Sequence, residues 1–208
     1  MFDYIKNPAE IYARSFEIIR SETDLSSVPQ DAEDIAVRII HACGMPEVIS
    51  DLHISADFAS AAKKALAKKR PILVDVEMVR HGIIARQLPL GVEIICTLND
   101  PRAREIGITK AITRTAAATE LWLPNLEGAI VVIGNAPTAL FALLEAIYHG
   151  APKPACIAGF PVGFVGAAES KDELIANPRG IPFATLKGRK GGSAMASSVI
   201  NALTSDQS

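Results

Sequence analysis

Apolar residues in this chain gather in short runs, and these alternate with longer segments of helical periodicity. Five near-continuous apolar runs predict strands that are buried on both faces of a sheet: Ile72–Val76, Val92–Thr97, Ala129–Gly134, Ala155–Phe160 and Pro182–Lys187. Segments whose apolar residues recur every three or four positions predict helices between and after these strands: Met78–Arg86, Lys110–Leu121, Pro137–Tyr148, Ala167–Ala176 and Gly192–Leu203. Two or three further helices are predicted ahead of the first strand, around Pro8–Ser21, Pro29–Cys43 and Ser55–Lys68.

This alternation of strands and helices determines the predicted fold class. Apolar strands separated by helices are typical of a parallel sheet covered on both faces. Right-handed crossovers then make a doubly wound, flavodoxin-like three-layer α/β sandwich the simplest topology. A chain of 208 residues suits one such domain. We therefore expect a single domain over residues 1–208, with a five-stranded parallel sheet and extra N-terminal helices.

The helix predicted at Pro29–Cys43 carries a histidine in its last turn. Ser27 can cap the start of this helix, and Gly44 supplies the left-handed residue that commonly ends one. The apolar positions form one stripe, and His41 lies almost opposite it, so the imidazole points away from the core. The negative end of the helix dipole favours a protonated imidazole, and histidine is the side chain best suited to move a proton near neutral pH. A solvated surface histidine is the alternative at this point.

Composition excludes several classes of function. The formal net charge is −2 and no basic run is interleaved with aromatic residues, which argues against a nucleic-acid-binding protein. No apolar run approaches the length of a membrane span, and the N-terminus lacks the apolar core of a signal peptide. Three cysteines without paired spacing are typical of reduced thiols, so we expect a cytoplasmic protein that is not bound to a membrane.

The carboxyl ends of the predicted strands are where a fold of this kind binds ligands. Glycine-rich loops follow most of these strands, and their exposed backbone N–H groups suit carboxylates or phosphates. The loops lack both the glycine pattern of a dinucleotide fold and the ending of a P-loop. Glu77 and His81, together with Asp75, suggest a metal site, but no further ligand is evident, so we expect none. Ser193 has no assignable histidine and acid partners for nucleophilic catalysis.

Several motifs, found in order along nearly the whole chain, together resemble those of the precorrin-8X methylmutase family of cobalamin biosynthesis. The two longest lie after the third and fourth predicted strands, at Gly134-Asn-Ala-Pro-Thr138-Ala and Pro161-Val-Gly-Phe-Val-Gly-Ala-Ala-Glu-Ser-Lys171. The others are Ile11-Tyr-x-Arg14-Ser15-Phe, Arg38-Ile-Ile-His41-Ala-Cys-Gly44, Asp75-x-Glu-Met78-Val-x-x-Gly82 and Gly191-Gly-Ser193.

The resemblance implies an isomerase that moves a methyl group from carbon 11 to carbon 12 of precorrin-8X and gives hydrogenobyrinate without a cofactor. It assigns the catalytic histidine to His41 and a substrate contact to Ser15. Arg14 and Arg114 suit the carboxylates of this substrate, because guanidinium binds carboxylate through two hydrogen bonds. The other residues expected to bind substrate are Met78, Gly82, Asn135, Thr138 and Gly163. The family also implies a homodimer with the pocket at its interface.

Three alternatives stay open. The chain could be a cobalt-precorrin-8 methylmutase, since the same fold performs this rearrangement on the cobalt-containing substrate, although the match over Pro161–Lys171 favours the metal-free one. It could instead be a non-catalytic module that binds a tetrapyrrole. A flavodoxin-like enzyme acting on a phosphorylated metabolite is the third reading, since the glycine-rich loops suit phosphate as well.

Overall fold

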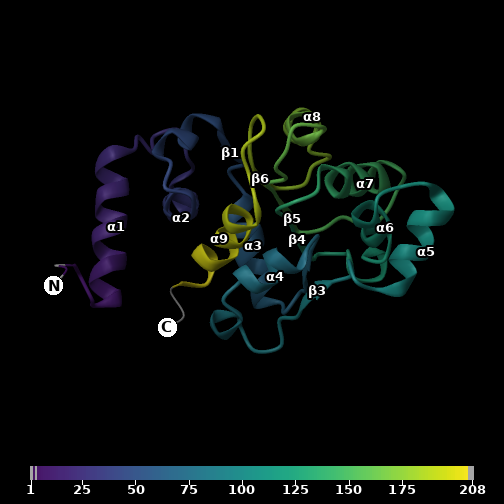
Figure 1. Ribbon diagram of the computed structural model, residues 1–208, viewed down its shortest axis with the longest axis horizontal. Helices are drawn as coiled ribbons and strands as arrows, with labels where there is room; N and C mark the ends of the chain where they lie inside the picture. Colours follow the sequence, from purple (N-terminus) through teal and green to yellow (C-terminus); the bar gives the residue numbers. More distant parts are fainter. Residues whose placement is uncertain (1, 3, 206–208) are drawn as a thin grey trace.

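The protein folds around one six-stranded sheet with helices on both faces (Figure 1). The computed structural model describes residue 2 and residues 4–205. The strand order is β1-β6-β5-β4-β2-β3. Neighbouring strands from β6 to β3 run parallel, and only β1 pairs antiparallel, with β6. The strands are β1 Leu52–Ile54, β2 Ile72–Val74, β3 Ile94–Cys96, β4 Ile130–Ile133, β5 Cys156–Gly159 and β6 Phe183–Leu186.

The five predicted strands are confirmed, each shorter than its apolar run, and their order is the flavodoxin-like one. The predicted count of five strands is wrong because β1 adds a sixth. This edge strand has only three residues, and Leu52 lies opposite Leu186 in its antiparallel register with β6. A run of three residues has no periodicity of its own, so its pairing depends on a partner more than a hundred positions away.

The helices are α1 Pro8–Glu22, α2 Glu33–Cys43, α3 Phe58–Ala67, α4 Glu77–Gly82, α5 Pro101–Lys110, α6 Arg114–Glu120, α7 Pro137–Tyr148, α8 Ala167–Ala176 and α9 Ser193–Leu203. The predicted helix at Met78–Arg86 is wrong in its length, since α4 stops at Gly82 and a separate 3₁₀ turn follows. The predicted cap by Ser27 is also wrong, because a 3₁₀ turn precedes α2 and neither start has a side-chain cap.

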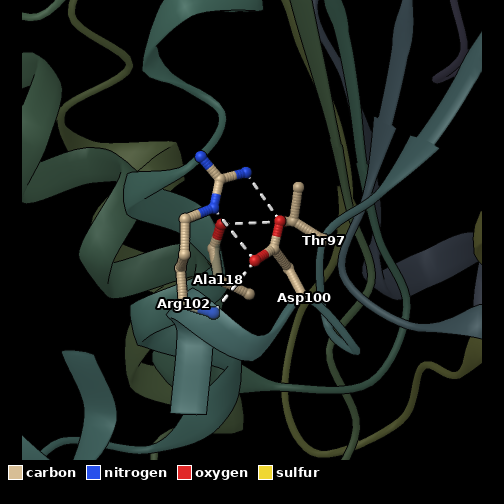
Figure 2. A network of polar contacts seen from close by, with 4 residues as sticks. All are labelled: Thr97, Asp100, Arg102 and Ala118. Atoms are coloured by element: carbon tan, nitrogen blue, oxygen red, sulfur yellow. Dashed lines mark hydrogen bonds and ion pairs between the residues drawn. The ribbon is translucent and has the colours of Figure 1, made fainter. Parts of the chain in front are cut away.

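Helix α5 was not predicted, and its start explains why it forms (Figure 2). The Asp100 carboxylate accepts the backbone N–H of Arg102 at 2.9 Å and pairs with its guanidinium at 2.6 Å. These contacts lower the pKa of Asp100 to about 2. Pro101 occupies the first helical position, where its missing N–H costs nothing. The Thr97 hydroxyl, which follows β3, donates to the Ala118 carbonyl at 2.8 Å and ties this turn to α6.

Alternate side chains of the central strands belong to two hydrophobic clusters, one on each face of the sheet. Ile72 and Val74 of β2 pack with α2, α3, α4 and α9, whereas Leu73 packs with α7 and α8 on the opposite face. Helix α1 lies outside this sandwich, against α2, and contributes Ile19 to the first cluster. Figure 1 shows α1 and α5 at opposite ends of the longest axis of the molecule. The N-terminal helices therefore extend the fold beyond its sheet.

Candidate active site

The end of α2 places His41 against the helix that covers it. Gly44 adopts a left-handed conformation (φ 67°), and its N–H donates to the Ile40 carbonyl at 2.7 Å, which closes the helix as predicted. The stripe that includes Ile35 and Ile39 is buried in the core, so His41 faces the other way, toward α1. The side chain is half-buried and is not the solvated surface histidine that α2 alone allowed.

Three side chains of α1 surround the imidazole of His41. Ser15 Oγ lies 2.8 Å from Nδ1, which is hydrogen-bonding distance. The ring of Tyr12 lies 5.5 Å from the imidazole centroid, and that of Phe16 lies 5.4 Å away at a right angle. Positions 12, 15 and 16 share one face of a helix, so α1 presents all three to α2. Among the described residues Nε2 of His41 has no hydrogen-bond partner, and this nitrogen is left for a ligand.

The charge around His41 differs from the expectation based on the helix dipole. Burial lowers the pKa of His41, and the neighbouring Arg38 guanidinium lowers it further. Arg38 lies over the rings of Tyr12 and Phe16, at 5.6 and 5.5 Å from their centroids. Burial and Arg38 therefore act against the protonation that the helix dipole favours. A polyanionic ligand would reverse this effect, because its negative charge favours the imidazolium.

A cavity of about 450 Å³ opens beside this histidine, between α1 and the end of α2. Arg14, Ser15 and His41 line it together, so the structure brings three predicted site residues to one cavity. The Arg14 guanidinium forms an exposed ion pair with Glu17 at 3.0 Å, and a carboxylate of a ligand could replace that partner. The rest of the wall is mainly apolar: Ile5, Ile11, Ile18, Ile19, Ile40 and Pro46.

A second group of predicted residues lies along the carboxyl edge of the sheet, by which we mean the ends of the parallel strands and the loops that follow them. The Asn135 carbonyl, after β4, accepts the N–H of Val162 at 3.4 Å, which brings the loop after β5 alongside. Gly163, in that loop, donates its N–H to the Arg189 carbonyl at 3.2 Å. The loops after β4, β5 and β6 therefore form one continuous surface.

Arg114 and Thr138 lie at the end of the molecule far from His41. The Thr138 hydroxyl bonds to those of Thr113 and Thr115 at 2.8 and 3.1 Å, and these two threonines flank Arg114 in sequence. Arg114 is exposed and has no ion pair among the described residues. Because α6 and α1 lie at opposite ends in Figure 1, one protomer does not bring Arg114 to the His41 cavity.

Met78 and Gly82 lie on the short helix α4. Met78 is 62% exposed, so its side chain is free to contact a ligand. Gly82 packs against α9, where an added Cβ would clash with the Ser197 hydroxyl. The absence of a side chain at Gly82 is thus explained by helix packing, whatever else the residue does.

Asp75 directly follows β2 at the topological switch point, where strand order reverses and doubly wound folds commonly bind ligands. Its carboxylate accepts the backbone N–H groups of Gly134, Asn135 and Ala136, each at 2.9 Å. Burial raises the pKa of Asp75, while the three hydrogen bonds act in the opposite direction. The protein thus fills this anion site with its own side chain, which disfavours a phosphorylated ligand there.

The acidic and histidine residues after β2 do not converge on a metal. Glu77 lies 3.9 Å from His81 and 3.6 Å from Arg80, in exposed pairs on one helix face. Asp75 is turned into the protein and bonded to backbone N–H groups. No group of three or more metal-ligating side chains occurs in the part of the chain that the structure describes.

Sequence reasoning missed Tyr12, Phe16 and Arg38 as neighbours of His41. The spacing of Tyr12, Phe16 and Ile19 signals one apolar face on α1, but only the packing of α1 on α2 shows which side chain that face encloses. Over the described residues, none of the helices combines the length and apolar character needed to cross a membrane.

Comparison with known proteins identifies the family of the chain. The family model described as precorrin-8X methylmutase matches residues 10–205. Relatives named precorrin-8X methylmutase are 54% identical in Sinorhizobium sp, over 97% of this chain and 96% of the relative, and 50% identical in Pseudomonas aeruginosa, over all of both chains. Relatives named cobalt-precorrin-8 methylmutase are 32–38% identical.

A solved structure of a precorrin-8X methylmutase from Thermus thermophilus superimposes with a TM-score of 0.85, at 35% identity and 95% coverage of both chains. Sequence and fold therefore agree over almost the whole chain. The chain belongs to the precorrin-8X methylmutase family, and it is an isomerase, a methylmutase of cobalamin biosynthesis.

Proposed function

We propose that this protein moves the methyl group at carbon 11 of precorrin-8X to carbon 12, with His41 as the proton donor. The observation that carries the proposal is the cavity in which Arg14, Ser15 and His41 meet. Nδ1 of His41 is occupied by Ser15, so Nε2 is the nitrogen that can reach a bound macrocycle. Protonation of, or a hydrogen bond to, the ring nitrogen beside the migrating centre favours the tautomer from which the methyl group shifts.

The serine hydroxyl suits this role because it can both donate and accept a hydrogen bond. In the imidazolium, Nδ1–H donates to Ser15 Oγ while Nε2–H faces the cavity. When Nε2 gives up its proton, Nδ1–H keeps its partner and the imidazole does not have to turn. The rings of Tyr12 and Phe16 pack against other sides of the imidazole. This arrangement requires no cofactor.

We propose that the working unit is a cytoplasmic homodimer with the substrate between protomers. The cavity holds about 450 Å³, near the lower end of the range for drug-sized ligands, and a tetrapyrrole with its side chains is larger than these. Arg114 and Thr138, on α6 and α7, lie away from this cavity in one protomer. A second copy that faces the cavity with its carboxyl edge would bring these substrate-binding residues to His41. The same contact would cover the exposed Ile11 and Ile18 of α1.

We also propose that the natural substrate is metal-free. The chain is 54 and 50% identical to relatives named precorrin-8X methylmutase, against at most 38% for relatives named for the cobalt substrate. Incubating the protein with each substrate and following the absorption spectrum tests this directly. Faster turnover of the cobalt form would contradict the assignment.

His41→Asn tests the chemical role of the histidine. Asparagine keeps a hydrogen-bonding side chain of similar size but cannot become cationic near neutral pH. The variant should fold and bind the corrinoid product, and its turnover should fall roughly 10²–10⁴-fold, as is typical for loss of a general acid. Turnover within a few-fold of wild type would exclude proton donation by His41. A wild-type protein that binds precorrin-8X and returns it unchanged would instead be a binding module.

A further inference from the structure

The loop between β5 and α8 exposes two large apolar side chains that the described contacts do not explain. Phe164 is 83% exposed and Val165 is 88% exposed. They lie between Gly163 (φ 147°) and Gly166 (φ 79°), two backbone conformations that residues with side chains rarely adopt. The two glycines turn the backbone so that Phe164 and Val165 form the tip of the loop.

The tip is held in place by the next loop, between β6 and α9. The Arg189 carbonyl accepts the N–H of Gly163 at 3.2 Å, and the Arg189 guanidinium lies 5.3 Å from the centroid of the Phe164 ring. The Nζ of Lys171, whose side chain is fully buried, donates to the Lys190 carbonyl at 2.6 Å. These contacts fix a guanidinium beside an exposed aromatic ring. Among the described residues, that guanidinium has no carboxylate partner.

The same loop connects the tip to the His41 cavity. Lys190, next to Arg189, forms an ion pair with Glu47 at 3.4 Å. Glu47 directly follows Pro46, which lines the cavity with His41. A continuous surface therefore runs from the cavity wall through the loop after β6 to Phe164. A macrocycle too large for the cavity can extend along this surface.

We propose that Phe164 and Arg189 form a substrate-contacting pair, with the ring covering an apolar part of the macrocycle and the guanidinium binding one of its peripheral carboxylates. The chemistry of the two groups matches that ligand, which is apolar across its ring and anionic around its edge. Guanidinium binds carboxylate through two parallel hydrogen bonds, and its stacking on Phe164 limits the orientations it must lose on binding. The proposal rests on the proposed function and adds two specificity-determining residues to it.

The test measures binding of the stable corrinoid product and turnover of precorrin-8X by Phe164→Ala, Phe164→Leu and Arg189→Gln. Phe164→Ala should weaken binding and raise KM roughly tenfold, the loss expected when an aromatic side chain no longer buries its area. Phe164→Leu should recover part of that loss because it keeps apolar area. Arg189→Gln should weaken binding about tenfold at low salt and by less at high salt, because added salt screens the contact that is removed. In all three variants kcat should stay within a few-fold of wild type, since these contacts lie away from the migrating methyl group.

Leu90→Ala and Arg70→Gln are the matched controls. Leu90 is 91% exposed, and both residues precede strands, at the opposite edge of the sheet, so neither change should alter binding. The proposal would be overturned if both Phe164→Ala and Arg189→Gln bound the corrinoid product with wild-type affinity. If these variants also changed their oligomeric state, the two residues would belong to a protein interface. Failure of the wild-type protein to convert precorrin-8X would contradict the proposed function instead, and the two failures are therefore distinguishable.

Discussion

The hydrogen bond between Ser15 and His41 makes a quantitative prediction about turnover. Ser15→Ala removes one hydroxyl that lies 2.8 Å from Nδ1 and leaves the apolar walls of the histidine in place. In the imidazolium that donates the proton, this hydrogen bond is made by a charged group, and such bonds contribute about 1.5–3 kcal/mol net. If that free energy holds the imidazole in its productive orientation, its loss lowers kcat by roughly 10- to 150-fold. This overlaps only the lower end of the loss expected for His41→Asn.

Steady-state kinetics separate this positioning role from direct contact with substrate. A positioning serine lowers kcat and leaves KM nearly unchanged, whereas a serine that binds the macrocycle equally well in the ground and transition states raises KM. In a His41→Asn background, Ser15→Ala should cost no further kcat, because the side chain it orients is absent. Ser21→Ala is the matched control, since Ser21 lies on the same helix and its hydroxyl donates to the Ile18 carbonyl at 2.8 Å. An additive loss in the double variant, or an equal loss in Ser21→Ala, would refute the reasoning.

Four further outcomes are expected. Arg114→Ala should weaken binding of the macrocycle with little change in kcat, measured by titration at low salt, and an unchanged affinity would make this arginine structural or solvent-facing. The pH profile of kcat/KM should fall as pH rises through the lowered pKa of His41, on the acid side of 6.5, and that of kcat should fall at higher pH because bound carboxylates favour the imidazolium. Gly134→Ala should lower the free energy of unfolding by about 1–3 kcal/mol in urea titrations, since its Cβ would lie 2.6 Å from Val79 Cγ2. Backbone amides of β2, β4 and β5 should exchange most slowly with deuterium, and faster exchange there than in α1 would contradict the central placement of these strands.

Much of the fold follows from local pattern alone. Strands β2, β4 and β5 are fully buried, β6 is nearly so and the edge strand β3 is partly buried, and each of the five lies in an apolar run of the sequence. Helices α7 and α8 begin and end at the predicted residues. Their starts were predictable because Pro137 is the first residue of α7 and Gly166 directly precedes α8. Helix α5 escaped prediction because it buries only Ala103 and Gly107 and has little apolar periodicity. Its capping sequence, Asp100 followed by Pro101, was the signal that could have found it.

The candidate site was predictable in part. His41 was singled out because it lies at the end of a helix and away from the apolar stripe of that helix. The resemblance to the methylmutase family added Ser15 and Arg14, which line the same cavity. The direction of the pKa shift was not predictable, because it depends on burial by α1 and on Arg38. Burial by α1 is a long-range contact, and the position of Arg38 is a side-chain orientation. Neither can be inferred from the periodicity of α2. The sequence also did not predict that the Asp75 carboxylate accepts three backbone N–H groups, because these groups lie some sixty positions along the chain.

Asp75 also bears on why the cavity lies where it does. In a doubly wound fold the backbone N–H groups at the switch point form a ready anion site. Here the Asp75 carboxylate occupies them, so an anionic ligand placed there would meet a buried carboxylate and lose the donors it needs. The His41 cavity lies instead between α1 and α2, helices that precede the first strand of the fold. The proposed proton donor thus lies on an addition to the fold, and the carboxyl edge can take part through a ligand, or a second protomer, that reaches from one to the other.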